Sequence, residues 1–563
     1  MVFGIPPGLF LIAGALLVPL FNGRWRKMYM LLLPCVGLWY LAGSQSGTFL
    51  PFTFLEYAIV PVRIDPLSLI FGYVFHIAAA LSVVYAWHND DVIEQVAGLA
   101  YAGAGIGAVF AGDLITLFVY WEAMAITSVF LIWARRTDTA YAAGMRYLII
   151  QVGSGVLLLS GAILMAHETG SIAFEKMTPG SLATWLILIA FGIKCAFPLL
   201  HNWLSDAYPE STATGTVFLS AFTTKCAVYV LARGFPGTEL LIYVGAAMVL
   251  FPVFYALIEN DLRRVLAYAL NQQLGFMVVG IGIGTTLAIN GAVAHAFVST
   301  LYKALLFMSM GAVLYRVGTV KASELGGLYK SMPLTAAFCI IGAASISSFP
   351  LFSGFVAKSL TLSAVAYEGY FVIWMILLAA SVGAFLHSGI KVPFAAFFAQ
   401  DSGKRCEEAP LNMLIAMGIT AFLCIAIGVY SPWLYSLLPY PVKYAPYTTS
   451  HIIGQLQLLA FSALGFGLLL RYGIYPRALK SLNLDFDITY RKWLPGLYRS
   501  GINLTRGGWQ GILQELRNVI NSFVAYMFRH HGPEGILART WPTGSMALWV
   551  AVLLGGILLI YYI

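Results

Sequence analysis

Apolar stretches of about 20 residues recur along residues 4–563 of this chain, and short polar segments separate them. A helix of that length crosses the hydrocarbon core of a bilayer, which is roughly 30 Å thick. Only 10% of the 563 residues are charged, and the mean hydropathy is +0.83. This pattern excludes a soluble domain and predicts an all-α polytopic membrane protein with about 16 transmembrane helices.

Basic residues are unevenly distributed among the predicted loops. They cluster after odd-numbered spans, in the groups Arg24, Arg26 and Lys27; Arg135, Arg136 and Arg146; Arg263 and Arg264; Arg316, Lys321 and Lys330; Lys404 and Arg405; and Arg471, Arg477 and Lys480. Loops rich in Lys and Arg face the cytoplasm, so topology explains the net charge of +8 and no nucleic-acid partner is implied. We expect a multi-pass protein of the cell inner (plasma) membrane with both termini on the outer (periplasmic) side.

Five charged side chains lie in the middle of stretches apolar enough to cross a membrane. They are Glu122, Lys194, Lys225, Lys358 and Lys391. A charge near the bilayer centre costs at least a few kcal/mol, so such residues face a polar interior and carry protons or ions. The pattern therefore indicates ion translocation.

The carboxylate and the first lysine are natural partners. Glu122 lies nine residues after Asp113, which places it near the middle of its span, and Lys194 lies in the apolar run LIAFGIKCAFPLL. A lysine whose hold on its proton depends on a nearby carboxylate is a switchable proton site. The alternative is a static ion pair that joins two helices.

Further titratable residues lie in the later spans. Lys225 follows Lys194 by one helix, and His295 and Lys303 lie two turns apart on one predicted helix. We interpret these three residues as a relay, with snorkelling of Lys225 and a purely structural His295 as the alternatives. Lys358 follows a proline and a glycine that leave backbone groups free to hold water, whereas Lys391 lies nearer a helix end.

The four lysines of the apolar spans form two similarly spaced pairs. Lys194 and Lys225 are 31 residues apart, and Lys358 and Lys391 are 33 residues apart. A proline lies near the first lysine of each pair, after it in one case and before it in the other. This arrangement favours an inverted duplication of about five helices, in which broken helices meet near the membrane midplane.

The tail of the chain has a different pattern. A span near residues 452–470 precedes a polar region, and a last span covers about residues 546–563. Within the polar region the apolar residues Ile512, Leu513, Leu516, Val519, Ile520, Phe523, Val524, Met527 and Phe528 recur at helical spacing. They predict an amphipathic helix along the membrane surface or against a partner. Prolines and glycines in this region argue against one unbroken helix.

Signals for cofactors and metals are weak. The six cysteines include no C-x-x-C pair, and five of them lie inside apolar spans. The sequence contains no P-loop, no dinucleotide fingerprint and no obvious pair of haem-ligand histidines. We expect no cofactor, no metal site and no disulfide.

Several segments resemble the proton-translocating antiporter family, which holds the large subunits of Mrp-type sodium/proton antiporters and the antiporter-like subunits of respiratory complex I and related hydrogenases. They are DLITLFVYWEAMAI, GMRYLIIQVGSG, FGIKCAFPLLHNWLSDAYPEST, LSAFTTKCAVYVLAR, DLRRVLAYALNQQLG, STLYKALLFMSMGAV and SSFPLFSGFVAKSL. The stretch AYPESTATGTVFLSAFTTK is most similar to the D-type subunit of Mrp antiporters. The resemblance implies fourteen core helices with two inverted five-helix repeats, each with a broken helix and a half-channel.

The resemblance also implies roles for particular residues. Glu122 modulates Lys194, Lys225 links the two halves, and His295 with Lys303 continues a polar axis that ends at Lys358. The chain departs from the family at two positions. Ser299 stands where many relatives have histidine, and Gln273 stands where some relatives have histidine. Neither replacement titrates, so that part of the axis depends on water and Lys303.

The predicted organisation combines these observations. It comprises N-terminal helices (residues 1–92), a first antiporter repeat (93–235), a second antiporter repeat (236–400), a fourteenth-helix region (401–450) and a C-terminal extension (451–563). The tail is longer than in a typical D-type Mrp protein and resembles the end of the distal antiporter-like subunit of complex I.

These features predict a secondary-transporter subunit rather than a catalytic enzyme. We expect a proton-translocating subunit of a multisubunit cation (Na⁺)/proton antiporter, whose partners are the other subunits, protons, Na⁺ and the lipid bilayer. The alternatives are an antiporter-like subunit of a redox-driven pump, an energy-coupling subunit for inorganic-carbon uptake, and a scaffold with inert ion pairs.

Overall fold

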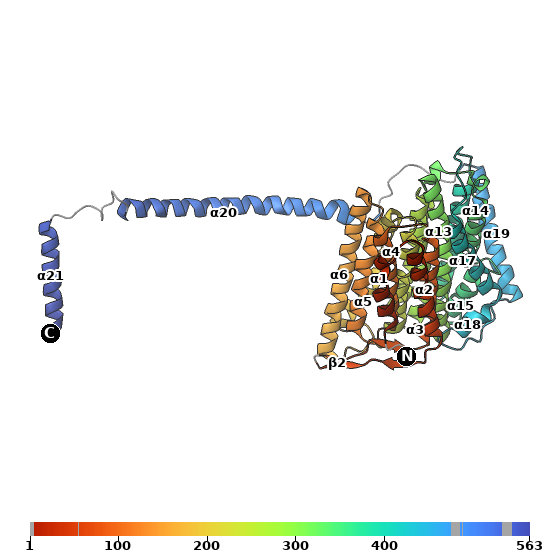
Figure 1. Cartoon of the computed structure of the whole chain (residues 1–563), viewed down its shortest axis with the longest axis horizontal. Coiled ribbons are helices and arrows are strands. Elements are labelled where there is room, and N and C mark those ends of the chain that lie inside the picture. The colour runs from red at the N-terminus through yellow and green to blue at the C-terminus, as the bar shows by residue number, and fades with distance from the viewer. Residues whose placement is uncertain (1–4, 55, 474–484, 487, 532–542, 563) are drawn as a thin grey trace. The chain divides into compact units, whose positions relative to one another are not determined.

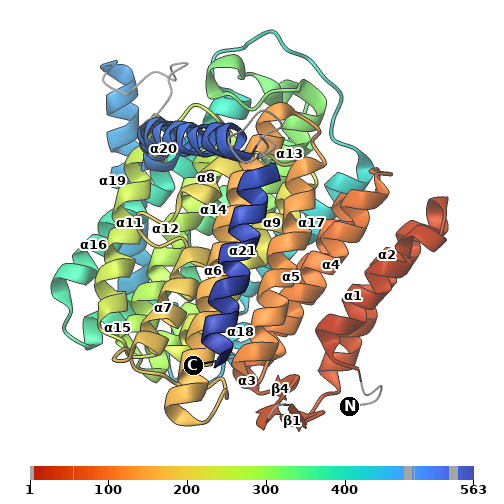
Figure 2. The ribbon, with the colours of Figure 1, turned by 90° about the vertical axis from the view of Figure 1, so that its left-hand side faces the viewer.

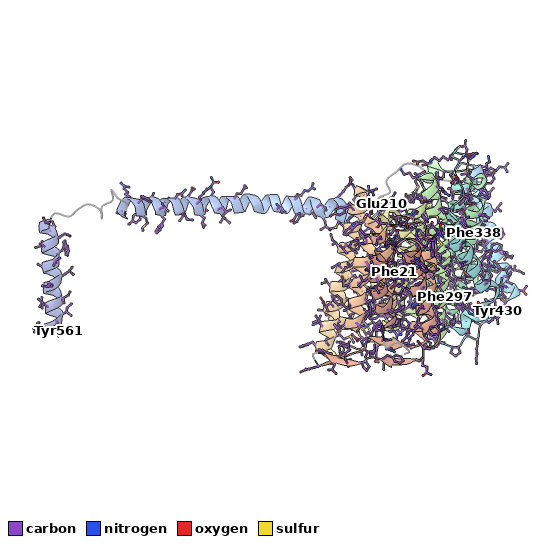
Figure 3. All side chains as sticks on the ribbon, in the orientation of Figure 1. Phe21, Glu210, Phe297, Phe338, Tyr430 and Tyr561 are labelled. Carbon is purple, nitrogen blue, oxygen red and sulfur yellow. The ribbon has the colours of Figure 1, made fainter. Side chains whose placement is uncertain are left out.

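The computed structural model describes residues 5–54, 56–473, 485–486, 488–531 and 543–562. The chain divides into two compact units, Met1–Asn483 and Leu484–Ile563. The first unit is a bundle whose helices mostly share one direction (Figure 1, Figure 2). Side chains fill the spaces between these helices (Figure 3), so that Phe297 is buried, whereas Tyr430 is exposed.

The chain begins with three helices and two short strand pairs. Their bounds are α1 (Pro7–Leu17), the 3₁₀ turn η1 (Val18–Leu20), α2 (Gly23–Ala42), β1 (Gly47–Phe49), β2 (Phe52–Phe54), β3 (Tyr57–Ile59), β4 (Val62–Ile64) and α3 (Pro66–Tyr85). Strand β1 pairs antiparallel with β4, and β2 pairs antiparallel with β3. The predicted all-α fold lacked these strands, because three residues are too few to show a clear alternation.

Helices α4 to α19 complete the bundle. The first group is α4 (Val92–Phe110), α5 (Leu114–Trp133), α6 (Asp138–Thr169), α7 (Leu182–Lys194), α8 (Asn202–Ala207), η2 (Tyr208–Glu210), α9 (Gly215–Ala221) and α10 (Thr223–Gly234). The second group is α11 (Leu240–Ile258), α12 (Leu262–Ile283), α13 (Thr286–Val317), η3 (Ala322–Glu324), η4 (Leu328–Lys330), α14 (Pro333–Ile346), α15 (Ser353–Tyr367) and α16 (Phe371–Ala384). Two π-helical segments, η5 (Phe385–Lys391) and η6 (Phe394–Phe398), follow, and then α17 (Leu411–Val429), α18 (Ser431–Ser436) and α19 (Thr449–Arg471).

Among the described residues, 12 helices are long and apolar enough to cross a membrane. Shorter apolar helices cover Pro7–Leu20, Leu182–Lys194 and Pro333–Ile346. A helix that breaks partway through the membrane is too short to meet such a length criterion, although its two parts together span the bilayer. The structure is therefore a polytopic helical membrane protein, and the total of about 16 spans stays a prediction.

Two helices of the bundle break at comparable points. The first break separates α7 from α8, and the second separates α14 from α15. Left-handed backbone angles occur in both, at Ala196 (φ 60°), Leu199 (φ 70°), Ser348 (φ 58°) and Leu351 (φ 74°). This conformation costs an L-residue roughly 1–2 kcal/mol, so both breaks hold strained backbone. The prolines near Lys194 and Lys358 in the sequence, Pro198 and Pro350, lie inside the two breaks.

Aspartates start corresponding helices in the two groups. Asp113 caps α5 by accepting from the Thr116 amide, and Asp261 caps α12 by accepting from two amides of its first turn. Each aspartate also forms an isolated antiparallel bridge with a residue 60 positions later, Ala173 in the first group and Lys321 in the second. Each group of helices thus contains one helix capped by an aspartate that also forms a bridge, and one broken helix.

Several ion pairs join loops that carry the predicted cytoplasmic basic residues. They are Lys27 with Asp90 (2.8 Å), Arg136 with Asp91 (2.6 Å), Arg135 with Glu210 (3.4 Å), Arg316 with Glu407 (3.3 Å) and Lys330 with Asp401 (3.0 Å). Exposed pairs of this kind contribute roughly 0–1 kcal/mol each to stability. These ion pairs matter for the topology, because they show that the loops they join lie on the same side of the bundle.

Asp65 caps α3 and forms a partly buried ion pair at the start of that helix. It accepts from the Ser68 amide and from the Arg233 guanidinium, the latter at 2.7 Å. Burial alone would raise the pKa of Asp65, but the charge of Arg233 outweighs it, and the pKa lies below its usual range. The carboxylate therefore stabilises the fold above about pH 4, and this contribution is lost as the pH falls further.

Replacing Asp65 with Asn is expected to destabilise the protein by about 3 kcal/mol, since it leaves the guanidinium of a nearly buried arginine without its countercharge. The expected observation is a lower unfolding temperature in detergent at neutral pH, with the difference from wild type shrinking below about pH 4. Asp138→Asn, an exposed substitution in the first turn of α6, serves as the control. Equal unfolding temperatures for the two variants would contradict this role.

The second unit contains the segment η7 (Thr489–Trp493), α20 (Leu494–His531) and α21 (Thr543–Tyr562). Helix α20 is one continuous helix of 38 residues, so the expectation that prolines and glycines break it is wrong. Pro495 lies directly after the π-helical segment η7, near the start of α20, and the internal glycines lower helix propensity without ending the helix. Gly532 and Pro533 lie outside the described residues.

Candidate functional site

Glu122 lies on α5 and faces α6. Its Oε1 atom is buried and has no hydrogen-bond partner among the residues that the structure describes. A Cβ atom at Gly155 of α6 would overlap this carboxylate, so glycine is what leaves room for the side chain. Buried polar atoms are almost always hydrogen-bonded. The unpaired oxygen is therefore available to a proton or to an approaching cation.

Lys194 is the last residue of α7 and is fully buried. Its ammonium donates to the carbonyl oxygen of Trp121, the residue before Glu122, and Nζ lies 4.3 Å from the centroid of the Trp121 ring. The indole donates to Ser154 at 2.9 Å, and the Ser154 hydroxyl donates to the carbonyl of Ala190 at 2.8 Å. This network ties α5, α6 and α7 together around the lysine.

The structure brings Glu122 and Lys194 near each other without joining them. Their charges lie within range of electrostatic interaction, but no ion pair within 4.0 Å links them in the part of the chain that is described. A static ion pair, which the sequence left as the alternative, is not the arrangement observed. The lysine is held instead by a backbone carbonyl beside the carboxylate.

Lys225 lies just after an interruption between α9 and α10. The interruption is at Phe222, which ends one helix and precedes the next. The Lys225 ammonium is buried and donates to the carbonyl oxygen of Ser220 at 2.9 Å. Snorkelling, which the sequence left as an alternative, does not describe this side chain, because it points to a buried carbonyl.

His295 and Lys303 lie on α13, as predicted. Lys303 is fully buried, and in the described part of the chain its Nζ donates only to the carbonyl oxygen of Leu266, at 3.4 Å. It lies within electrostatic range of both Lys225 and Lys358. Lys303 therefore occupies the middle position between the lysines of the two helix groups.

Lys358 lies on α15, after the second break. Its ammonium donates to the carbonyl oxygen of Ile346, the last residue of α14, at 2.8 Å. The partly negative C-terminal end of the half-helix thus faces the lysine. Nζ also lies 5.1 Å from the Phe276 ring, which packs edge-on against His295.

Lys391 has a different environment. It ends the π-helical segment η5 and donates to three carbonyl oxygens at the C-terminal end of α11, those of Ala256 (3.0 Å), Leu257 (2.7 Å) and Glu259 (2.6 Å). A cation at this position stabilises a helix end. The helical span that carries Lys391 continues to Phe398, so the helix end beside this lysine is that of α11 and not that of its own span.

Sequence reasoning missed several polar residues that the structure places between these sites. His387, Gln272 and Tyr302 are buried and hydrogen-bonded. Gln273, which the sequence shows only as a departure from the family, lies with its amide oxygen 3.1 Å from His295 Nε2 and can accept a hydrogen bond from it. The available signal was a second histidine, in the segment FLHSGIK, within an apolar span.

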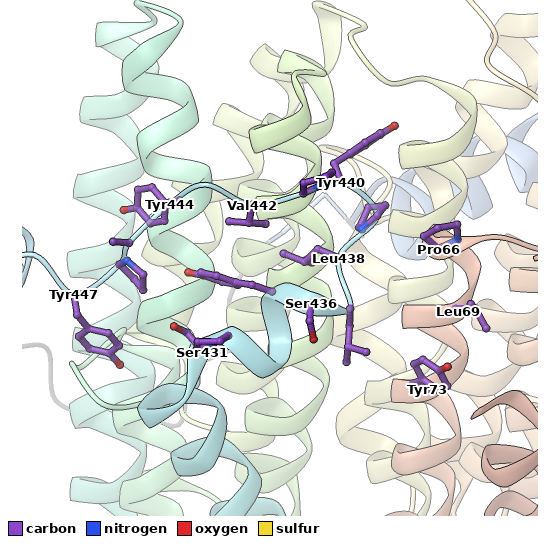
Figure 4. Close-up of a pocket in the computed structure, with 17 residues that line it drawn as sticks. Pro66, Leu69, Tyr73, Ser431, Ser436, Leu438, Tyr440, Val442, Tyr444 and Tyr447 are labelled. Carbon is purple, nitrogen blue, oxygen red and sulfur yellow. The ribbon is translucent and has the colours of Figure 1, made fainter. Parts of the chain in front are cut away.

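A pocket of about 940 Å³ lies outside this series (Figure 4). It is formed by the start of α3, by α18 and by the loop after α18, and tyrosines such as Tyr73, Tyr435 and Tyr444 line it. Its lining contains none of the seven titratable residues named from the sequence. The candidate site is therefore the buried series within the bundle.

Comparison with known proteins identifies the membrane region. Residues 111–384 match the family described as NADH:quinone oxidoreductase/Mrp antiporter, TM. Hydrogenase-4 component B of Escherichia coli (strain K12) is 29% identical over 431 residues, covering 67% of this chain and 64% of that protein. The Na⁺/H⁺ antiporter subunit A1 of Staphylococcus aureus (strain JH9) is 28% identical over 500 residues, covering 79% and 61%. The chain thus spans less than two thirds of the length of these relatives.

Two solved structures share the fold. A chain of the Mrp complex from Dietzia sp. DQ12-45-1b superimposes with a TM-score of 0.76 at 21% identity, covering 92% of this chain and 62% of that chain. A chain of the membrane-bound sulfane sulfur reductase, an archaeal respiratory membrane complex, superimposes with a TM-score of 0.71 at 21% identity, covering 98% and 99%. Residues 111–384 therefore match the family described as NADH:quinone oxidoreductase/Mrp antiporter, TM, and the chain shares its fold with one chain of the Mrp complex and one chain of the sulfane sulfur reductase.

Proposed function

We propose that this chain is a proton-translocating subunit of a multisubunit cation/proton antiporter, equivalent to the D-type large subunit of Mrp complexes. The observation that carries the proposal is the set of buried lysines Lys194, Lys225, Lys303 and Lys358, each of which reaches a backbone carbonyl. In the described part of the chain none of them has a carboxylate within 4.0 Å. The relatives named as Na⁺/H⁺ antiporter subunits supply the cation for the proposal.

The energetic argument concerns the neutral form of each lysine. An unpaired ammonium in a low-dielectric interior costs several kcal/mol, and releasing its proton removes that cost. A neutral amine still donates to the same carbonyl oxygen, so the side chain keeps its place when the proton leaves. Both protonation states are thus accessible, as a proton-carrying site requires.

Glu122 and the two helix breaks determine the direction of proton movement in this mechanism. A proton on the Glu122 carboxyl group removes the negative charge near Lys194 and lowers the cost of discharging that lysine. The proton then moves to Lys225 and Lys303, and it leaves at Lys358 beside the second break. Water held by free backbone groups at the breaks provides the connection to each side of the membrane.

We also propose that the two groups of helices are inverted repeats, covering about residues 93–235 and 236–400. The shared bridges of Asp113 and Asp261 and the shared left-handed positions of the two breaks support this division. The ion pairs between basic loops support a cytoplasmic location for that side of the bundle. We propose in addition that both termini lie on the outer side, as an even number of spans implies.

A second candidate function is proton pumping driven by a redox partner. The structural match that covers 98% of this chain is to a respiratory reductase complex, and another relative is a hydrogenase component. In this alternative the same lysines carry protons, and another subunit supplies electrons. Flavin or iron–sulfur absorbance in the purified native complex would favour the redox-driven pump, and its absence together with cation-dependent proton release would favour the antiporter.

The experiment that tests the main proposal is cation/proton exchange in inverted membrane vesicles that carry the complex. Lys194→Ala and Glu122→Ala are each expected to reduce Na⁺-driven proton movement by roughly 10²-fold, because each removes a proton-transfer group. Complex content in the vesicles is measured in parallel. Unchanged exchange in both variants would refute the mechanism.

A further inference from the structure

A chain of hydrogen-bonded side chains begins at His295, which lies on the same helix as Lys303. His295 Nε2 lies 2.9 Å from the Tyr302 hydroxyl and 3.1 Å from Gln273 Oε1. The Gln273 amide donates to Gln272 Oε1 at 3.3 Å, and His387 Nε2 lies 2.9 Å from the same oxygen. The chain therefore crosses from α13 through α12 to the π-helical segment η5.

The neighbours of Gln272 determine the state of His387. The Gln272 amide nitrogen lies 2.6 Å from the carbonyl oxygen of Ala380, and only the amide NH₂ can donate to a carbonyl. Gln272 Oε1 is therefore the atom that faces His387, and it can only accept a hydrogen bond. Neutral His387 must then carry its proton on Nε2 and leave Nδ1 as an acceptor for the Ser388 hydroxyl, 2.8 Å away.

This geometry leaves one place for an additional proton. The amide oxygen of Gln272 cannot hold a proton at neutral pH, so a proton cannot pass from Nε2 along the glutamines. Nδ1 can accept one, and the Ser388 hydroxyl then turns from donor to acceptor. His387 thus has one nitrogen anchored and the other free to exchange protons.

The surroundings of His387 connect it to the proposed pathway. It lies within electrostatic range of Lys303, Lys358 and Lys391. Lys391 is four residues further along the same segment and contacts the end of α11, where the Glu259 carboxylate lies 3.8 Å from Arg264. The Arg264 side chain is 31% exposed, so this end of the branch reaches the polar edge of the bundle.

We propose that His387 is a further proton-carrying residue, which exchanges a proton at Nδ1 through Ser388 and Lys391 with the polar edge at Glu259 and Arg264. Gln272 and Gln273 are positioning residues. They hold the ring in one tautomer and link it to His295 without passing the proton themselves. This inference rests on the proposed function and adds to it a branch that runs from His387 past Lys391 to this polar edge.

The test is proton movement in vesicles that carry the whole complex, with His387→Gln as the main variant. Glutamine keeps a donor for Gln272 but cannot titrate, and the expected result is a loss of at least about tenfold in the proton-movement rate. His76→Gln is the matched control, since His76 is equally buried, on α3, and bonds only to the carbonyl of Gly72. It should retain the wild-type rate.

Two further variants separate the possible explanations. Ser388→Ala removes only the hydroxyl beside Nδ1, and it should slow proton movement even if His387→Gln lowers the amount of complex. Gln272→Met removes the acceptor, and ¹⁵N spectra of the purified complex should then show His387 as a mixture of tautomers instead of the Nε2–H form. A wild-type rate in His387→Gln and Ser388→Ala, with Lys194→Ala inactive, would overturn the branch but not the proposed function. Retained movement in all variants, including Lys194→Ala, would overturn both.

Discussion

Replacing Lys303 with Met is expected to stop proton movement while leaving the complex assembled. Lys303 is the middle lysine of the series, within electrostatic range of Lys225 and Lys358. A methionine of similar length fills the same space but cannot accept a proton. Ser299 and Gln273 do not titrate, so neither of these two neighbours replaces Lys303.

The expected loss in rate is roughly 10²-fold or more, the usual effect of removing a proton-transfer group. Stability should stay the same or rise, since the lysine is fully buried and its hydrogen bond to Leu266 is long, at 3.4 Å. The measurements are proton movement in vesicles and the unfolding temperature of the purified complex. This opposite behaviour of rate and stability distinguishes a transport role from a packing role.

Lys321→Met is the control for this prediction. Lys321 is an exposed lysine that pairs with Glu324 at 3.9 Å, so its loss should alter neither property. A Lys303→Met complex that still moves protons at the wild-type rate would show that the two halves communicate by another route. A complex that fails to assemble would show that the buried lysine is structural.

Gly155→Val is expected to reduce proton movement by roughly 10²-fold, because a small displacement of a reacting group has a large effect on rate. A side chain at this position of α6 would overlap the Glu122 carboxylate and push it out of its place near Lys194. Gly153→Val is a closely matched control. It adds the same side chain two residues earlier on α6, where a Cβ meets open space.

The double variant Gly155→Val with Glu122→Ala tests whether the effect passes through the carboxylate. If it does, the double variant should be no slower than Glu122→Ala alone, because the group that the valine displaces is already absent. A further loss in the double variant would instead indicate disruption of the packing between α5 and α6. Proton movement and complex content are measured on the same vesicles.

Much of the site was predictable because charge in an apolar span is conspicuous. Glu122, Lys194, Lys225 and Lys358 stand out in the sequence, and the structure buries the three lysines. The breaks near Pro198 and Pro350 were also expected, since proline interrupts helical hydrogen bonding. Hydropathy and proline act locally along the chain, so membrane spans and helix breaks can be predicted without a structure.

Other features depend on contacts between distant segments. Gly155 reads as an ordinary small residue of a membrane helix, and only the packing of α6 on α5 shows that it accommodates Glu122. The role of His387 is not predictable from the sequence, because its partner Gln272 lies 115 residues away along the chain. The continuous helix α20 was mistaken for a broken one, because glycine lowers helix propensity without forbidding a helix.

The sequence by itself determined that this chain is a helical membrane protein with a costly series of buried charges, since hydrophobic length and charge placement act one segment at a time. The tertiary structure decided which atoms those charges meet. Lys194 meets the Trp121 carbonyl and not a carboxylate, and Lys391 meets the end of α11. These partners come from different helices, and the packing of side chains between helices is a property that no single segment contains.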